Sequence, residues 1–285
     1  MPAVDGRLVR RAADGDHDAL EAVVRGVQDS VYRLALRMLW HPADAEDATQ
    51  EILVRLVTRL DAFRGEAAFE TWAYRVAVNH LLTTRRRRAE RAALSFDEFG
   101  EDLSHGLDRA YAAPGVDDAL LEEEVKVGCT QAMLLCLDRE HRAAYIVGEV
   151  FDLPSDEAAW ILDLTPAAYR KRLSRARERV RTFMEAHCGL VRAGNPCRCR
   201  RRIGTAVATG RVDPANLLFA RPNAVRRGVE ELERLHAAAA VLRSHPETRA
   251  PDALARRVLD IVRADGLSLL ANRCSRAASA PIESE

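Results

Sequence analysis

A long run of positive charge lies between residues 165 and 181, where seven basic side chains stand against one acidic residue, Glu178. Apolar residues recur there every three or four positions, which is the period of a helix with one buried face. Such a helix suits the phosphates of a nucleic acid, because each neutralised phosphate releases a counterion. The basic residues are Arg170, Lys171, Arg172, Arg175, Arg177, Arg179 and Arg181.

The segment before this charged helix predicts a helix-turn-helix. Ser155 is a favourable N-cap residue for a short helix that ends near residue 162, and Asp163 stands in a turn where aspartate tolerates a left-handed conformation. Thr165, followed by a proline, then begins the charged helix. Recognition helices present their N-terminal part to base edges, so we expect Arg170 and Lys171 there and the later arginines at phosphates. The alternative is a charged surface helix on an unrelated bundle.

Polar rows also occur in the first ninety residues. A predicted helix that begins near Glu70 ends in four arginines, Arg85 to Arg88, which is more positive charge than the helix dipole alone explains. Its polar face is formed by Arg75, Asn79 and Thr83. The preceding predicted helix, over residues 45–60, has an outward row of Asp47, Gln50 and Glu51. By itself such a row is equally typical of a solvated helix face.

Composition favours helices throughout. The chain has 285 residues, of which 5% are aromatic, and Ala, Leu, Arg and Glu dominate, so a β-sandwich or β-barrel is not expected. Hydrophobic residues make up 48%, enough for packed cores, and we predict an all-α protein with about two domains. The sequence has no bilayer-length apolar run and no hydrophobic signal core, so we expect a cytoplasmic protein without a membrane partner.

Charge patterning divides the chain further. Basic and acidic residues number 43 each, but residues 93–124 hold one basic and ten acidic side chains and little periodicity. This composition predicts a partly disordered tether, whose charge either mimics nucleic acid or keeps the tether solvated. The expected organisation is a helical domain over 1–92, an acidic flexible linker over 93–117, a helix-turn-helix domain over 118–186 and a helical extension over 187–285.

The cysteines allow several interpretations. Six cysteines without a secretory signal indicate reduced thiols, and Cys129 and Cys136 lie on an apolar helical stripe typical of a core. The extension begins with the ligand set of a tetrahedral zinc site, although its spacing is not that of paired Cys-x-x-Cys knuckles. Neighbouring arginines would lower the thiol pKa values, as in a redox sensor. Zinc binding, redox sensing and unreactive cysteines all stay open for His187, Cys188, Cys197 and Cys199.

Two stretches resemble the extracytoplasmic-function (ECF) sigma factors of bacterial RNA polymerase. Residues 43–88, which begin ADAEDATQEILVRLV, are similar to the region-two domain of that family. Residues 137–181, which begin LDREHRAAYIVGEVF, are similar to its region-four helix-turn-helix domain. With flanking helices the resemblance covers about residues 5–186. The order of the two motifs and the linker between them make the resemblance specific.

The resemblance implies a role for each polar row. The outward row of the second helix would bind core polymerase: Asp47, Gln50 and Glu51. The following loop and helix would bind the −10 promoter element and hold a flipped base: Phe63, Arg64, Phe69, Arg75, Asn79, Thr83, Arg85 and Arg86. The charged helix would bind the −35 element: Arg170, Lys171, Arg172, Arg175 and Arg177. Trp72 is interpreted as a core residue rather than a melting wedge.

The implied function is that of an alternative sigma factor, which binds core polymerase, recognises both promoter elements and supports promoter opening. The implied partners are the RNA polymerase core, promoter DNA and, as a candidate, an anti-sigma factor. The extension, with predicted helices over 223–243 and 251–270, either regulates the protein or only packs. One departure is Tyr169, which stands where the family usually has a small β-branched residue.

Two other classes of function are a binding protein that acts without polymerase and an enzyme. A helix-turn-helix regulator that never contacts polymerase is the alternative binding protein. An enzyme is not expected, because the sequence contains no HExxH motif, Gly-rich phosphate loop or nucleophile elbow.

Overall fold

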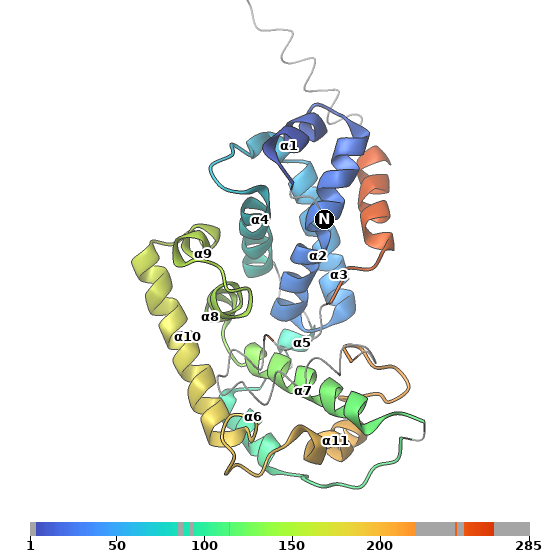
Figure 1. Cartoon of the computed structure of the whole chain (residues 1–285), viewed down its shortest axis with the longest axis vertical. Coiled ribbons are helices and arrows are strands. Elements are labelled where there is room, and N and C mark those ends of the chain that lie inside the picture. The colour runs from blue at the N-terminus through green and yellow to red at the C-terminus, as the bar shows by residue number, and fades with distance from the viewer. Residues whose placement is uncertain are drawn as a thin grey trace, which may run out of the picture. The chain divides into compact units, whose positions relative to one another are not determined.

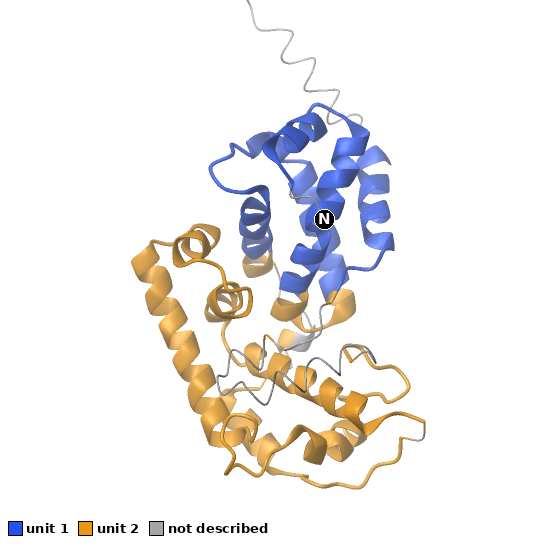
Figure 2. Cartoon of the chain, in the orientation of Figure 1, with its two compact units in different colours: residues 1–35, 45–80, 249–285 blue, residues 36–44, 81–248 orange. Residues whose placement is uncertain are grey.

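The computed structural model describes residues 4–84, 88–91, 94–113, 115–220, 243 and 248–264. Within these residues every regular element is a helix, apart from an isolated β-bridge between Cys188 and Cys197, which confirms the all-α prediction. The chain divides into two compact units, the first over residues 1–35, 45–80 and 249–285 and the second over 36–44 and 81–248 (Figures 1 and 2). No described helix is long and apolar enough to cross a bilayer.

The first unit contains α1 (Gly6–Ala13), most of α2 (His17–Leu39) and α3 (Pro42–Val57), the 3-10 turn η1 (Leu60–Ala62) and α4 (Phe69–Thr83). The three-to-four spacing of apolar residues is borne out, because Leu34, Ile52 and Ala77 are completely buried. At the end of α2, Trp40 takes a positive φ of 60°, which stops the helix before α3 begins. Burial of these apolar stripes holds the helices together.

Residues 253–264 form a further helix of the first unit, with Leu254, Ala255 and Val258 completely buried. The backbone amide of Ala250 donates to Asp29 Oδ1 on α2 at 3.0 Å. Arg257 forms an ion pair of 3.2 Å with Glu46 on α3. The C-terminal part of the chain therefore contributes to the same core as its first helices. The helix predicted over 251–270 is present in its described part, whereas the one predicted over 223–243 lies outside the described residues except Arg243.

The second unit contains the remaining helices, and α10 contacts α6, α8 and α9. The elements are α5 (Arg88–Arg91), α6 (Phe96–Ser104), α7 (Asp118–Leu135), α8 (Arg139–Tyr145), the π-helical turn η2 (Ile146–Val150), α9 (Ser155–Ile161), α10 (Pro166–His187) and α11 (Cys199–Ala208).

A buried ion-pair network lies inside the second unit. The Glu90 carboxylate accepts two hydrogen bonds from Arg139, at 2.8 and 2.5 Å, and one from Arg142 at 3.0 Å. Arg142 is only 3% exposed and also donates to the carbonyls of Leu134 and Met38. Transfer of a guanidinium group from water to the protein interior costs several kcal/mol. The ion pair with Glu90 and the hydrogen bonds to the backbone carbonyls offset this cost.

The acidic segment is folded, where the sequence predicted a flexible tether. Ser95 and Glu98 form a reciprocal capping box that begins α6. The ring of Phe99 on α6 stacks on Phe183 of α10, with 5.4 Å between ring centroids, and Leu103 is buried. The capping box and the burial of these apolar side chains outweigh the net charge that suggested disorder.

The carboxylates of this segment pair with arginines of the extension. Asp102 binds Arg202 at 3.0 Å and Arg211 at 2.5 Å, and the hydrogen bond from Arg211 holds the pKa of Asp102 below its usual range. Asp108 pairs with Arg201 at 2.5 Å. The acidic and basic runs that the sequence separates by about a hundred residues therefore neutralise each other in part.

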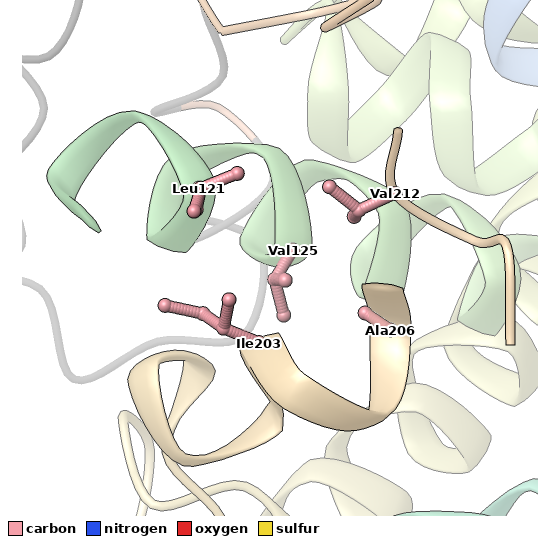
Figure 3. Packing of buried hydrophobic residues seen from close by; sticks show 5 residues of the cluster. All are labelled: Leu121, Val125, Ile203, Ala206 and Val212. Atoms are coloured by element: carbon pink, nitrogen blue, oxygen red, sulfur yellow. The ribbon is translucent and has the colours of Figure 1, made fainter. Parts of the chain in front are cut away.

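Helix α11 of the extension packs on α7, the first helix of the predicted helix-turn-helix domain. Figure 3 shows the apolar cluster between them, formed by Leu121, Val125, Ile203, Ala206 and Val212. Ile203 and Leu121 are completely buried. The two segments share one core, so the expected boundary at residue 187 does not separate two packing units.

Tyr169 is accommodated by a glycine on a neighbouring element. Its side chain is buried in the second unit, and its hydroxyl group occupies the space where a Cβ of Gly148 would stand. Gly148 belongs to the π-helical turn η2. Burial raises the pKa of Tyr169 to about 12. The large side chain of Tyr169 therefore fits because residue 148 is a glycine, which has no Cβ.

We expect Gly148→Ala to lower the free energy of unfolding by about 1–3 kcal/mol, because the added methyl group overpacks the site. Tyr169→Phe in the same chain removes the clashing hydroxyl and should restore part of the loss. Gly194→Ala is a matched control, since a Cβ at Gly194 meets no atom within 4 Å. Urea denaturation measures all three variants, and equal stability of Gly148→Ala and the parent chain would contradict the packing argument.

Candidate nucleic-acid interface

The predicted helix-turn-helix is formed by α9, a short turn and α10. The turn residue Asp163 has a φ of 55°, as its residue type suggested, and the Leu164 amide donates to the Ala159 carbonyl at 3.0 Å. The Thr165 hydroxyl caps α10 by accepting from the Ala168 amide at 3.2 Å. The N-cap expected at Ser155 is wrong: Pro154 takes that position, and Ser155 is the first residue of α9.

The two faces of α10 differ in burial. Six side chains point into the second unit: Tyr169, Leu173, Ala176, Val180, Phe183 and Met184. The predicted DNA-binding residues lie on the other side, where Arg170, Lys171, Arg175 and Arg177 are exposed and Arg172 is half-buried. The predicted DNA-binding residues therefore lie on one helix, and most of them are on its outer surface, because the apolar residues between them face the core.

The later arginines of α10 are held by carboxylates. Arg172 pairs with Glu140 at 2.9 Å, and the Arg177 Nε donates to Glu149 at 2.7 Å. Arg181 pairs with Glu178 and with Glu185, each at 2.7 Å. Glu140 and Glu149 belong to other elements, so the sequence pattern of α10 contained no signal for them, whereas Glu178 and Glu185 lie on α10 itself.

Three cations at the N-terminal half of α10 have no ion-pair partner in the described part of the chain. They are Arg170, Lys171 and Arg175, and all three are exposed. The N-terminus of a helix is also the positive end of its dipole. The positive potential of α10 is therefore concentrated where its first two turns leave the core, which suits an anionic partner.

The first unit carries the other predicted DNA-binding residues. Asn79 and Thr83 are exposed on α4 and Arg75 is half-buried, and their spacing of four residues places them along one face. In the loop before α4, Arg64 is exposed and Gly65 has a φ of 75°, so the loop turns through a conformation that favours glycine.

Phe69 is a core residue, contrary to the expectation that it contacts DNA. It is 2% exposed at the start of α4, and its ring lies 5.3 Å from that of Phe63 and 5.5 Å from that of Trp72. Phe63 and Trp72 are half-buried in the same aromatic cluster. Phe69 therefore anchors the loop, because aromatic clusters of this kind are held by apolar burial. Arg85 and Arg86 lie outside the described residues.

The predicted polymerase-binding row lies on the outer face of α3. Asp47 and Glu51 are exposed and Gln50 is half-buried. Glu51 Oε2 lies 3.3 Å from Nε2 of the buried His80 on α4, so the row is linked to the helix that carries Asn79. Sequence reasoning missed His80, because a histidine on a helix gives no signal of its neighbours.

Comparisons with known proteins agree with this architecture. Residues 23–91 match the family model described as Sigma-70 region 2. The chain is 30% identical over 180 residues to the RNA polymerase sigma-H factor of Pseudomonas aeruginosa, covering 62% of this chain and 91% of that protein. It is 31% identical over 179 residues to the ECF RNA polymerase sigma-E factor of Escherichia coli, covering 62% and 92%. It is 28% identical over 178 residues to the ECF RNA polymerase sigma factor SigW of Bacillus subtilis, covering 61% and 94%.

The chain belongs to the ECF family of RNA polymerase sigma factors. The matched relatives are covered almost completely, whereas more than a third of this chain lies beyond each alignment.

The zinc ligand set expected from the sequence does not converge. The ring of His187 packs on Phe183, with 4.9 Å between ring centroids, and faces Gly100. No three His, Cys, Asp or Glu side chains in the described ranges are arranged to hold a single metal ion. Cys188 and Cys197 are adjacent across the isolated β-bridge, and the Gly189 amide donates to the Cys197 carbonyl at 2.9 Å.

The expectation that arginines activate these thiols is not met at Cys197 and Cys199. Burial raises the pKa of Cys197 and, more strongly, that of Cys199. Arg202 and Arg198 act in the opposite direction on Cys197, but their effect is smaller than that of burial. A protonated thiol is a poor nucleophile, so these cysteines are not activated as redox sensors require.

We expect Cys136 and Cys199 to react slowly with iodoacetamide in the native chain at pH 7.5. Burial raises the pKa of Cys136 to about 11, so its thiolate fraction is roughly 10⁻³ or less at this pH. Mass spectrometry after timed alkylation measures each site, and the urea-unfolded chain provides the control rate. Equal rates in native and unfolded chains would show that the thiols are not protected.

Proposed function

We propose that this sigma factor acts as a promoter-specificity subunit, in which α9 and α10 bind the −35 element and the first unit binds both core polymerase and the −10 element. The observation that carries the proposal is the division of charge on α10. Arg170, Lys171 and Arg175 are left exposed at the end of the helix that a helix-turn-helix inserts into the major groove. The later arginines are paired with carboxylates of the same unit.

At the −35 element, the three exposed cations are placed for base edges and nearby phosphates. An arginine that binds guanine through two hydrogen bonds discriminates between bases, whereas a phosphate contact sets only the register. We assign the first role to Arg170 and Lys171 and the second to Arg175. Arg172 and Arg177 act through their ion pairs, which hold α10 against the preceding elements.

In the first unit, we assign polymerase binding to Asp47, Gln50 and Glu51 on α3. The −10 element is assigned to the loop before α4 and to the face that carries Asn79 and Thr83. Base flipping costs a few kcal/mol, which stacking and hydrogen bonds to this loop offset in the proposed complex. The exposed Arg64 and the half-buried Phe63 supply both kinds of contact.

The proposed domain organisation follows the packing units. Region two comprises the helices of the first unit together with residues 249–264, and region four includes α6, the acidic segment and the extension up to residue 220. The chain acts with polymerase in the cytoplasm and has no catalytic residues of its own. Its partners are core polymerase, promoter DNA and an anti-sigma factor that covers one of these exposed faces.

We expect Arg170→Ala to weaken binding to the cognate −35 sequence by about 1–3 kcal/mol relative to a mutated −35 sequence, because a bidentate base contact is lost. Arg181→Ala is the matched control, since Arg181 is already paired with two glutamates. Fluorescence anisotropy with both DNA sequences, at one salt concentration, measures the effect. An equal loss on both sequences would reassign Arg170 to a phosphate.

We expect Asn79→Ala to reduce promoter opening while core polymerase binding is unchanged, because we assign Asn79 to the −10 element and not to the polymerase-binding row. The double substitution Gln50→Ala and Glu51→Ala should do the reverse and weaken polymerase binding. Permanganate footprinting of the −10 region and surface plasmon resonance with core polymerase measure the two effects. Loss of polymerase binding in Asn79→Ala would contradict the assignment.

Run-off transcription with core polymerase and a genomic fragment library tests the function as a whole. The expected result is initiation at a defined set of promoters that share −10 and −35 sequences. Binding of DNA without association with core polymerase would instead identify a helix-turn-helix regulator.

A further inference from the structure

Five cysteines of the second unit line one cavity, and four of them form the group considered first. The cavity has a volume of about 250 Å³ and is lined mainly by apolar side chains. The four thiols of this group come from α7, from the residue that ends α10 and from the extension: Cys129, Cys188, Cys197 and Cys199. Sequence reasoning grouped only three of them and assigned Cys129 to a core stripe. The tertiary structure therefore replaces the expected histidine by a fourth thiol.

The four thiols are both deep and accessible. Burial raises the pKa values of Cys129 and Cys199, and the charges of the neighbouring cysteines raise them further. All four cysteines nevertheless keep accessible surface. The raised pKa values and the remaining accessible surface are consistent with each other, because the thiols line a cavity and are neither tightly packed nor exposed to bulk water. Cys136 lines the same cavity, but its pKa is not affected by another cysteine.

A single metal ion does not fit this arrangement. Zinc bound by four cysteines has Zn–S distances of about 2.3 Å, which brings the sulfur atoms within roughly 4 Å of one another and leaves no space between them. In the described chain no three ligating side chains converge in this way. The thiols instead surround a cavity larger than the engineered cavity of about 150 Å³ that holds a benzene molecule. The occupant must therefore be larger than one ion and must accept several thiolates.

The wall of the cavity also suits an anionic occupant. Lys126, Arg202 and Arg211 line it, and their nearest carboxylates are Glu123 and Asp102. Glu122 is a third nearby carboxylate, since its charge raises the pKa of Cys199, but none of the three carboxylates lines the cavity wall itself. A cluster held by four thiolates carries negative charge, which the three cations of the wall stabilise and which burial opposes.

We propose that this cavity binds an iron–sulfur cluster through the thiolates of Cys129, Cys188, Cys197 and Cys199. In such clusters each iron takes one or two cysteine sulfurs, so the four thiols stand around the perimeter instead of meeting at one point. Binding requires the thiols to lose their protons, which the metal ions promote. Because the ligands belong to α7, α10 and the extension, the cluster cross-links these parts of the second unit.

The test is anaerobic reconstitution of the full chain with ferric iron and sulfide in the presence of a thiol reductant, which reduces part of the iron, followed by desalting. The expected result is two or four irons with equal acid-labile sulfide per chain, and visible absorption that disappears on oxidation or chelation. Each of Cys129→Ser, Cys188→Ser, Cys197→Ser and Cys199→Ser should lower the iron content by roughly tenfold or more. Cys136→Ser and Cys274→Ser should retain it.

Folding and ligand identity are controlled separately. Far-UV circular dichroism and thermal melting of each apo variant show whether the chain still folds, and Cys→Ala versions replace any variant that does not. Zinc alone is titrated in parallel. An iron content below one per chain, and equal in the parent chain and all variants, would overturn the proposal. Binding of one zinc ion that iron and sulfide do not displace would also overturn it. These readouts do not depend on promoter activity, so their outcome is independent of the proposed function.

Discussion

Burial of the apolar face of α10 is the interaction on which the second unit depends. Six side chains of this helix enter the core, and each fully buried large apolar residue contributes about 1.5–3 kcal/mol. The helix contacts α6, α8 and α9, so it joins the acidic segment to the helix-turn-helix. The same burial fixes the rotation of α10 about its axis. It therefore decides which cations point outward and where Cys188, at the end of the helix, reaches the cavity.

Internal charge pairing shapes the surface more than it stabilises the fold. The exposed pairs, such as Asp108 with Arg201, are screened by solvent and contribute little to stability. Their effect is to cancel positive potential over the extension and the second half of α10. Among the described residues of α10, the three cations at its start are the arginines and lysine without an ion-pair partner. A chain with no net charge can therefore present a locally positive surface to nucleic acid.

The buried network around Glu90 follows a different rule. Arg142 is withdrawn from solvent, and Glu90 and backbone carbonyls satisfy its guanidinium group. Desolvation lowers the pKa of Arg142, and the carboxylate of Glu90 opposes this. Removal of one partner from such a pair leaves a buried charge unpaired, so the network specifies the packing of α8. The thiols of the cavity obey the same constraint, because a buried thiol stays neutral unless a ligand compensates its charge.

Local patterns along the chain determined much of this protein. The apolar spacing of α2, α3, α4 and α10, the cap at Thr165 and the positive φ at Asp163 follow from side-chain type and from neighbours within a few residues. The family was evident for the same reason, since its motifs are local. The aromatic role of Phe69 was misassigned, because spacing does not tell a loop residue that binds a ligand from one that anchors the loop.

Only the tertiary structure decided which distant residues meet. The pairing of Asp102 with Arg202 and Arg211, the place of Tyr169 over Gly148, and the joining of Cys129 to the thiols of the extension all connect different elements. Such contacts depend on the angle and register at which helices pack, which a periodic pattern does not encode. The acidic segment shows the consequence: its composition predicted a solvated tether, but apolar side chains at Phe99 and Leu103 found partners that its own sequence did not reveal.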